Sequence, residues 1–184
     1  NLLPLTAIHK GKLVHPITLY YNKKFNLVMI HSLSDVTGFE WDLAKTVSDI
    51  GKELKAKEII VIEGMQPHEK EQINLYYYSE RVKMKLKALE DGIVMGTTAA
   101  LLLKCKEIPV ICLFAEAHSQ LPDSEAAAKV VEALDTYLGL KVDFAPLLES
   151  ARKFEINLKH LIEKTKERIA VAQQPQQQEI SYIG

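Results

Sequence analysis

The chain opens with two runs of β-type residues and then changes to a helical period. Residues 16–21 (PITLYY) and 26–31 (NLVMIH) are rich in β-branched and aromatic residues, and the Asn-Lys-Lys sequence between them predicts a hairpin. Residues 37–40 (TGFE) match a capping box at a helix start. Apolar residues then recur at helical spacing, at Leu43, Ala44, Val47, Ile50 and Leu54. We therefore expect an N-terminal hairpin followed by a helix with one buried face.

Strand-like and helix-like segments continue to alternate. Residues 58–62 (EIIVI) and 109–114 (PVICLF) are short apolar runs, typical of strands covered on both faces, and residues 73–78 (INLYYY) predict a further strand. Helices are predicted after Ser79 (with Val82, Leu86 and Leu89 buried), over 97–103, and over 124–138 up to Gly139. This alternation predicts an α/β fold, a mostly parallel sheet with helices on both faces.

The last part of the chain predicts a long helix and a tail. Asp143 caps a helix that reaches about residue 173 and is on the order of 43 Å long. Its apolar residues recur in steps of four and three, like a coiled-coil seam, at Leu147, Ala151, Phe154, Leu158 and Leu161. The helix could lie across its own domain, but its length favours packing on another subunit. We divide the chain into an α/β core (1–143), the C-terminal helix (144–173) and a flexible tail (174–184).

The tail combines glutamines with an apolar end. Residues 173–178 (QQPQQQ) contain five glutamines and a proline, which cannot form a packed core, so the tail is expected to be a mobile tether. It ends in Ile180, Tyr182 and Ile183 before Gly184, which suits insertion into a pocket on a partner. A frayed end with chance apolar residues is the alternative.

Composition and charge narrow the class of protein. Hydrophobic residues make up 47% and charged residues 26% of the 184, as in ordinary globular proteins. The net charge of -1 lacks the basic excess of a nucleic-acid binder. No apolar run reaches the roughly 18 residues of a membrane span, and no signal peptide is evident. We expect a cytoplasmic protein with no nucleic-acid or membrane partner, whose Cys105 and Cys112 are reduced and buried.

Candidate chemistry is sparse. Gly92 and Gly96, leading into Thr97 at a helix start, could hold an anion, but they match neither GxGxxG nor GxxxxGK[ST], and tight packing would also explain the glycines. Glu63 ends a buried strand, where open α/β sheets bind ligands. Other acid/base or ligand side chains lack nucleophile or HExxH patterns; these are His68, Glu69, Glu71, Glu116, His118 and Asp123. We therefore predict no catalytic residue, no metal and no cofactor.

Four segments together resemble a known family. These are HPITLYYN, GFEWDLAKTVSDIGKELKAKEIIVIEGM, GIVMGTTAALLLKCKEIPVICLFAEA and LPDSEAAAKVVEALDTYLGLKVDFAPLLESA. Their order is similar to that of the proteasome assembly chaperone family, specifically the archaeal homologues of its second eukaryotic member, from about His15 to Phe154. The resemblance implies a core related to nucleoside phosphorylases but used for binding. It also implies a homo-oligomer, with a tetramer as the first guess, that contacts the α-ring of the core proteasome.

The resemblance also gives the tail a possible role. Some archaeal relatives are ATP-independent proteasome activators with a C-terminal motif of a hydrophobic residue, Tyr and any final residue, whose terminal carboxylate pairs with a lysine between α subunits. Here Tyr182 is third from the end, with Ile183 and Gly184 after it, so the sequence departs from the motif. The expected function is assembly chaperone or activator. The alternatives are an enzyme of the nucleoside phosphorylase type, which would use Glu63 and the Gly92–Gly96 turn, or a scaffold that binds a small ligand or another partner.

Overall fold

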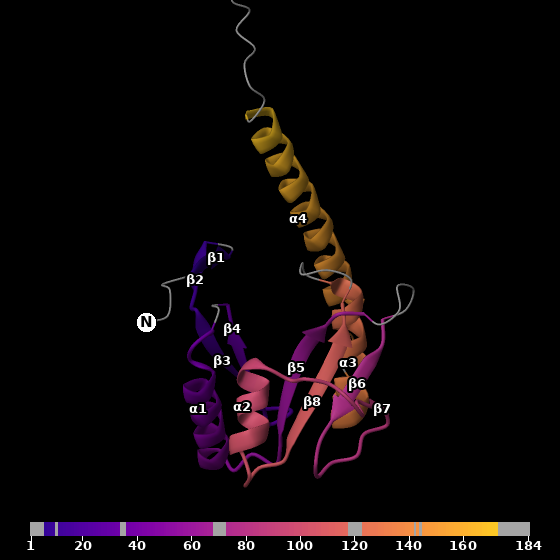
Figure 1. The fold of residues 1–184 in the computed structure, drawn as a ribbon. Coiled ribbons are helices and arrows are strands. Elements are labelled where there is room, and N and C mark those ends of the chain that lie inside the picture. Colours follow the sequence, from indigo (N-terminus) through magenta and orange to yellow (C-terminus); the bar gives the residue numbers. More distant parts are fainter. Residues whose placement is uncertain are drawn as a thin grey trace, which may run out of the picture.

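The computed structural model describes residues 6–9, 11–33, 36–67, 73–117, 123–141, 143 and 145–172. Figure 1 shows an α/β core with two hairpins on one side and a long helix that projects away from it. No helix among these residues is long and apolar enough to cross a membrane.

A four-stranded sheet forms the centre of the core, in the order β5-β8-β6-β7. β5 (Ile59–Met65) pairs with β8 (Val110–Glu116) in parallel, and β6 (Leu75–Tyr78) pairs with β7 (Lys87–Ala88) in parallel. β6 runs antiparallel to the central strand β8. The prediction of a mostly parallel sheet is therefore corrected to a mixed sheet, because strand direction follows from chain connections that apolar runs do not encode.

Helices cover both faces of this sheet (Figure 1). On one face, α1 (Glu40–Glu53) and α2 (Gly96–Lys104) pack against alternate residues of β8, including Cys112 and Phe114. On the other face, α3 (Ser124–Leu138) packs against Ala115 through Ala126 and Val130. Every residue of β8 is buried, as its uninterrupted apolar run predicts.

Two hairpins precede the core. β1 (Ala7–His9) pairs with β2 (Lys12–Val14), and β3 (Ile17–Asn22) pairs with β4 (Leu27–Ser32), both antiparallel. The predicted hairpin is confirmed, with its turn closed by a 3.4 Å bond from the Asn26 amide to the Lys23 carbonyl. Asn26 has φ 47°, in the left-handed region that asparagine tolerates better than most residues.

Three helix ends, two of α3 and one of α4, follow local chemistry. Asp123 caps α3 by accepting from the Glu125 and Ala126 amides, and Gly139 ends it at φ 64°. Asp143 Oδ1 accepts from the Ala145 amide at 3.1 Å, where α4 (Ala145–Ala172) begins. At α1 the capping-box prediction is wrong. The Phe39 amide closes a turn onto Val36, with Gly38 at φ 86°, and the helix begins only at Glu40.

The helix predicted after Ser79 is also wrong. Residues 79–86 are irregular and lead into β7. Ser79 Oγ accepts from the Arg81 and Val82 amides at 3.4 and 3.3 Å, which is a local turn, and donates to the Val110 carbonyl at 2.7 Å. The serine thus ties this segment to the central strand instead of starting a helix.

Candidate functional site

Glu63 lies where sequence reasoning placed it, near the carboxyl end of β5. Its Oε1 accepts a hydrogen bond from Thr98 Oγ1, and Thr98 is a fully buried residue in the first turn of α2. The free amides of a helix start carry partial positive charge, which favours a carboxylate there. Glu63 therefore joins β5 to α2.

The residues of the predicted anion site border this contact. Gly96 is the first residue of α2, with φ 69°, and Thr97 follows it with a buried Oγ1 that has no hydrogen-bond partner among the described residues. An added Cβ at Gly96 would meet nothing within 4 Å, so backbone conformation and not packing requires a glycine there. Gly92 lies in the exposed segment before α2. The anion site stays a prediction. The carboxylate of Glu63 already contacts this helix turn through Thr98.

Both cysteines are free and buried, as predicted. Burial, and then the negative charge of Glu63, raises the pKa of the Cys112 thiol to about 12. Cys105 Sγ lies 3.5 Å from Ser48 Oγ and 3.6 Å from the Ile108 carbonyl oxygen. A nucleophilic cysteine needs a lowered pKa and access to solvent, so Cys112 is instead a small core residue.

A second carboxylate, Glu116, is fully buried at the end of β8. Its Oε2 accepts from the Asn74 amide at 2.9 Å and from Asn74 Nδ2 at 2.8 Å. These charge-assisted bonds fix the segment that leads into β6 against the central strand. His68, Glu69, Glu71 and His118, named with Glu116 as candidate ligands or acids, lie outside the described residues. Within the described ranges, no three His, Cys, Asp or Glu side chains gather into a possible metal site.

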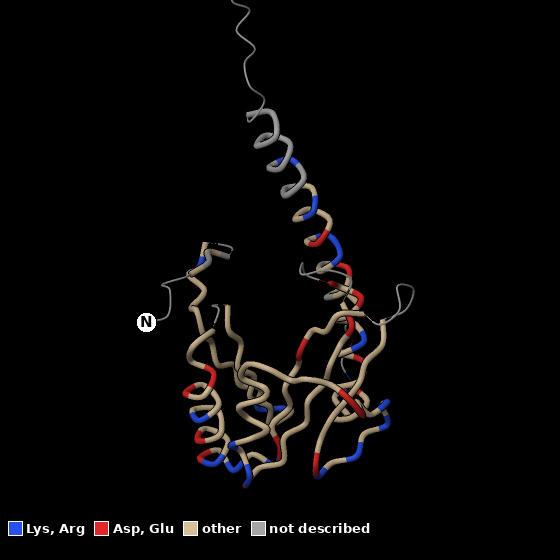
Figure 2. The backbone as a smooth tube through the Cα atoms, viewed as in Figure 1, with Lys and Arg blue, Asp and Glu red and all other residues tan. Residues whose placement is uncertain are grey.

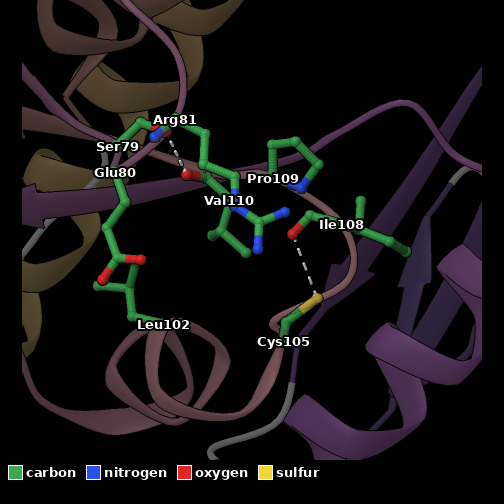
Figure 3. A pocket seen from close by; sticks show the side chains of 8 residues that line it. All are labelled: Ser79, Glu80, Arg81, Leu102, Cys105, Ile108, Pro109 and Val110. Carbon is green, nitrogen blue, oxygen red and sulfur yellow. Dashed lines mark hydrogen bonds between the residues drawn. The ribbon is translucent and has the colours of Figure 1, made fainter.

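A small cavity lies between α2 and the segment after β6 (Figure 3). Its lining residues are Ser79, Glu80, Arg81, Leu102, Cys105, Ile108, Pro109 and Val110. A volume of ≈ 20 Å³ holds about one water molecule and excludes a metabolite. The Arg81 guanidinium donates to the carbonyls of Lys106 and Glu107, so this arginine holds the loop before β8.

Glu155 fastens α4 to the core. Its Oε2 accepts from the Ser124 amide at 3.0 Å and from Ser124 Oγ at 2.7 Å, at the start of α3, and its Oε1 accepts from Lys159 at 2.6 Å. The bonds from Lys159, and then from Ser124, lower the pKa of Glu155 to about 2. Glu155, which belongs to α4, thus caps the N-terminal end of α3. Sequence reasoning missed it, because only its spacing to Lys159 is visible in the sequence.

The described residues of the predicted α4 seam differ in burial. Ala151 and Leu158 are half-buried, on the same side of α4 as Glu155, whereas Phe154 is 60% exposed. Leu147 and Leu161 have side chains outside the described part of the chain. Phe154 is therefore the described seam residue that is free to contact another subunit.

The tail residues Ile180, Tyr182, Ile183 and Gly184 lie beyond the last described residue, Ala172. Figure 1 shows that α4 carries its C-terminal end away from the sheet. Whatever follows Ala172 therefore starts at a distance from the core.

Comparison with known proteins identifies a family and a fold. A model of the PAC2 family matches residues 2–162. An uncharacterized protein of Methanocaldococcus jannaschii is 28% identical over 173 residues, which cover 89% of this chain and 71% of that protein.

Solved structures show the same fold. PbaA of Pyrococcus furiosus, an archaeal homolog of proteasome-assembly chaperone, superimposes with a TM-score of 0.73 at 25% identity, covering 91% of this chain and 78% of PbaA. A Thermoplasma acidophilum protein of unknown function has a TM-score of 0.73 at 19% identity, covering 93% and 74%. PbaB of P. furiosus, an archaeal proteasome activator, has a TM-score of 0.59 at 16% identity, covering 90% and 78%. The likeness to the last two is one of fold.

Proposed function

Because this chain belongs to the PAC2 family, we propose that it is a proteasome-binding protein without enzymatic activity, an assembly chaperone or an ATP-independent activator. The observation that carries the proposal is the combined likeness in sequence and fold to PbaA. The partner is the α-ring of the core proteasome, and the protein acts as a homo-oligomer.

The direction of α4 supports a role for the tail. The helix leaves the core at the Glu155–Ser124 contact and ends at Ala172, from where the remaining 12 residues can extend about 40 Å at most. In a homo-oligomer several such tails would bind a ring of repeated pockets together, and weak individual contacts would gain avidity. Ile180, Tyr182 and Ile183 are the proposed anchors, with Gly184 beside them.

The test is peptide hydrolysis by an archaeal core proteasome without ATP, with and without the full chain. An activator raises the rate, and a variant with Ile180, Tyr182 and Ile183 changed to serine loses the increase. Ser181→Ala, in the same tail, is the matched control and keeps it. A protein that binds in a pull-down without raising the rate is an assembly chaperone.

Two outcomes contradict the proposal. One is the absence of binding to the core proteasome and to its free α subunits. The other is release of nucleobase from nucleosides and phosphate, abolished by Glu63→Gln, which would establish the enzyme alternative.

Phe154 allows a separate test of the proposed α4 interface. Phe154→Asp is expected to lower the mass of the homo-oligomer in sedimentation velocity, because a charge would enter an apolar contact. Ile156→Asp is the matched control, since Ile156 is 54% exposed but two positions along the helix and so on a different side. Equal masses for wild type and Phe154→Asp would remove α4 from the interface.

A further inference from the structure

The segment that leads into β7 carries its positive charges on one side. Residues 81–87 (RVKMKLK) alternate strictly between basic and apolar side chains. Each basic residue of this run is exposed and each apolar one is half-buried, so the basic side chains share the outer side. In the helix that the sequence predicts here, with about 3.6 residues per turn, Lys85 would lie on the other side from Lys83 and Lys87. The common side therefore depends on the irregular, near-extended course of the segment.

Two charged residues at the start of this segment are used by the core. The Arg81 guanidinium donates to the carbonyls of Lys106 and Glu107, which fixes the segment to the loop before β8. The Glu80 side chain points towards Leu102 at the small cavity (Figure 3). Arg81 and Glu80 thus belong to the wall of that cavity.

The other three cations, Lys83, Lys85 and Lys87, form a row that we call the lysine row, and Figure 2 shows it in blue along the segment before β7. Consecutive members are two residues apart, at most about 7 Å along the backbone. This is less than the Debye length of about 8 Å at physiological salt, so their charges reinforce one another. Within the described ranges no carboxylate pairs with them, although Glu90 and Asp91 follow β7 in the chain. The lysine row is therefore a local concentration of positive charge, which attracts an anionic partner.

The lysine row lies at an edge of the sheet. β7 is the last strand in the order β5-β8-β6-β7, and among the described residues no strand pairs with its outer side. The outer edge of a strand presents N–H and C=O groups to which another polypeptide strand can bind. Like charges that face each other across two strands are destabilising, so lysines here repel the same edge of a second copy. The edge therefore excludes its own copy and favours an acidic strand.

The surroundings of the lysine row favour a polypeptide over a nucleic acid. Proteins bind single-stranded nucleic acids by stacking the bases on aromatic side chains. Residues 79–91 contain no aromatic residue, and the net charge of the chain is -1. A nucleic acid also lacks a peptide backbone that could pair with the edge of β7. An acidic protein segment can supply both the negative charge and the backbone groups.

We propose that the lysine row is a docking site for an acidic, extended segment of a partner protein. Side chains on one face of a strand recur at every second residue, so carboxylates at alternate positions of the partner match Lys83, Lys85 and Lys87 one for one. Opposite charges that face each other across neighbouring strands stabilise the pair. This contact lies on the core and uses neither the tail nor α4, so it goes beyond the proposed function.

Fluorescence anisotropy at low ionic strength tests the proposal with the full chain and a labelled peptide of alternating Glu and Thr. The control peptide has the same composition, but two Glu alternate with two Thr. One face of its extended form offers a carboxylate only at every fourth residue, so at least one lysine of the row is left without a partner. We expect the control peptide to bind about threefold more weakly, the loss of one exposed ion pair.

Variants of the protein test the same contact from the other side. Changing all three lysines of the row to glutamine is expected to weaken binding of the alternating peptide about tenfold. The matched control changes Lys12, Lys23 and Lys24 of the hairpins to glutamine, which removes the same number of charges elsewhere. This control is expected to keep the affinity of the wild type.

Three results would overturn the proposal. The first is equal affinity of the wild type and the lysine-row variant. The second is an equal loss in the lysine-row variant and the hairpin control, which would mean that only net charge matters. The third is tighter binding of single-stranded oligothymidylate than of the alternating peptide, which would assign the row to a nucleic acid.

Carbodiimide cross-linking locates the contact directly. The reagent activates a carboxylate of the peptide, the lysine amine forms an amide bond with it, and the reagent leaves as a urea. Mass spectrometry is expected to find the peptide on Lys83, Lys85 and Lys87. Cross-links found only on lysines outside the row would contradict the proposed site.

Discussion

Two strand segments that begin with proline have nearly the same pattern of apolar residues, but one is buried and the other is exposed. Residues 16–21 (PITLYY) enter β3, and residues 109–114 (PVICLF) enter β8. Leu113 of β8 is 0% exposed, whereas Leu19 of β3 is 49% exposed. The difference lies in the neighbours. β8 has a strand on each side and helices on both faces, but among the described residues β3 pairs only with β4.

The comparison teaches that β-type residues specify an extended strand without specifying what covers it. Strand formation depends on local preferences, which both segments share. Burial depends on elements that are distant in the sequence. The apolar side chains of the hairpin are therefore in excess of what the core requires.

The largest expected difference between the two strands is in stability. Leu113→Ala is expected to lower the free energy of unfolding by about 3–5 kcal/mol, because it removes buried methyl groups and leaves a cavity. Leu19→Ala, the matched change on β3, is expected to stay within about 0.5 kcal/mol. Urea unfolding at low protein concentration, where the subunits are separate, measures both. Similar losses at the two positions would mean that the hairpin packs on the core.

Much of the fold is visible in the sequence because its signals are local. The β3–β4 hairpin, the strands β5 and β8, and the stop of α3 at Gly139 follow from short-range patterns. The segment after Ser79 shows how such a pattern can be misread. Val82, Leu86 and Leu89 fit helical spacing, but half-buried Val82, Met84 and Leu86 alternate with exposed Arg81, Lys83 and Lys85, which is the period of an extended chain.

The site was predicted less completely, because its contacts join distant parts of the chain. Glu63 could be placed at a strand end, since that position follows from the strand itself. Its partner Thr98 is 35 residues away, and Glu155 is 31 residues from Ser124. The direction of β6 also depends on how the chain returns to the sheet. None of these three features has a local signature.

A change at Glu155, at the junction between the core and α4, is expected to have an intermediate effect on stability. Glu155→Gln is expected to lower the melting temperature by about 2–4 °C at pH 7, because a helix cap contributes about 1 kcal/mol. Glu149→Gln is the matched control, since Glu149 pairs with Lys153 on the surface and its side chain is 69% exposed. Its melting temperature should equal that of the wild type.

The pKa of Glu155 makes this effect depend on pH. The folded pKa is about 2 and the ordinary value is 4.5, so the stabilisation is complete above pH 4.5 and is lost as the pH falls towards 2. The difference between wild type and Glu155→Gln should therefore shrink between pH 4.5 and pH 2. A difference that stays constant over this range would show that the charge of Glu155 is not what holds α4.

The smallest expected effect on the core comes from the turn of the hairpin, and it tests how far the two regions fold independently. Asn26 has φ 47°, in the left-handed region. Alanine cannot form the local hydrogen bonds that let asparagine tolerate this conformation, so Asn26→Ala is expected to destabilise the hairpin by about 1 kcal/mol. Asn26→Gly is the matched control, because glycine adopts this conformation freely. Since the hairpin contributes no side chain to the buried clusters, we expect the melting temperature of the core to move by less than about 1 °C in either variant.

Amide exchange of β3 and β4 is expected to become about fivefold faster in Asn26→Ala alone, in line with that cost. A loss of melting temperature as large as that of Glu155→Gln would contradict the separation, because it would require the hairpin and the core to unfold as one unit.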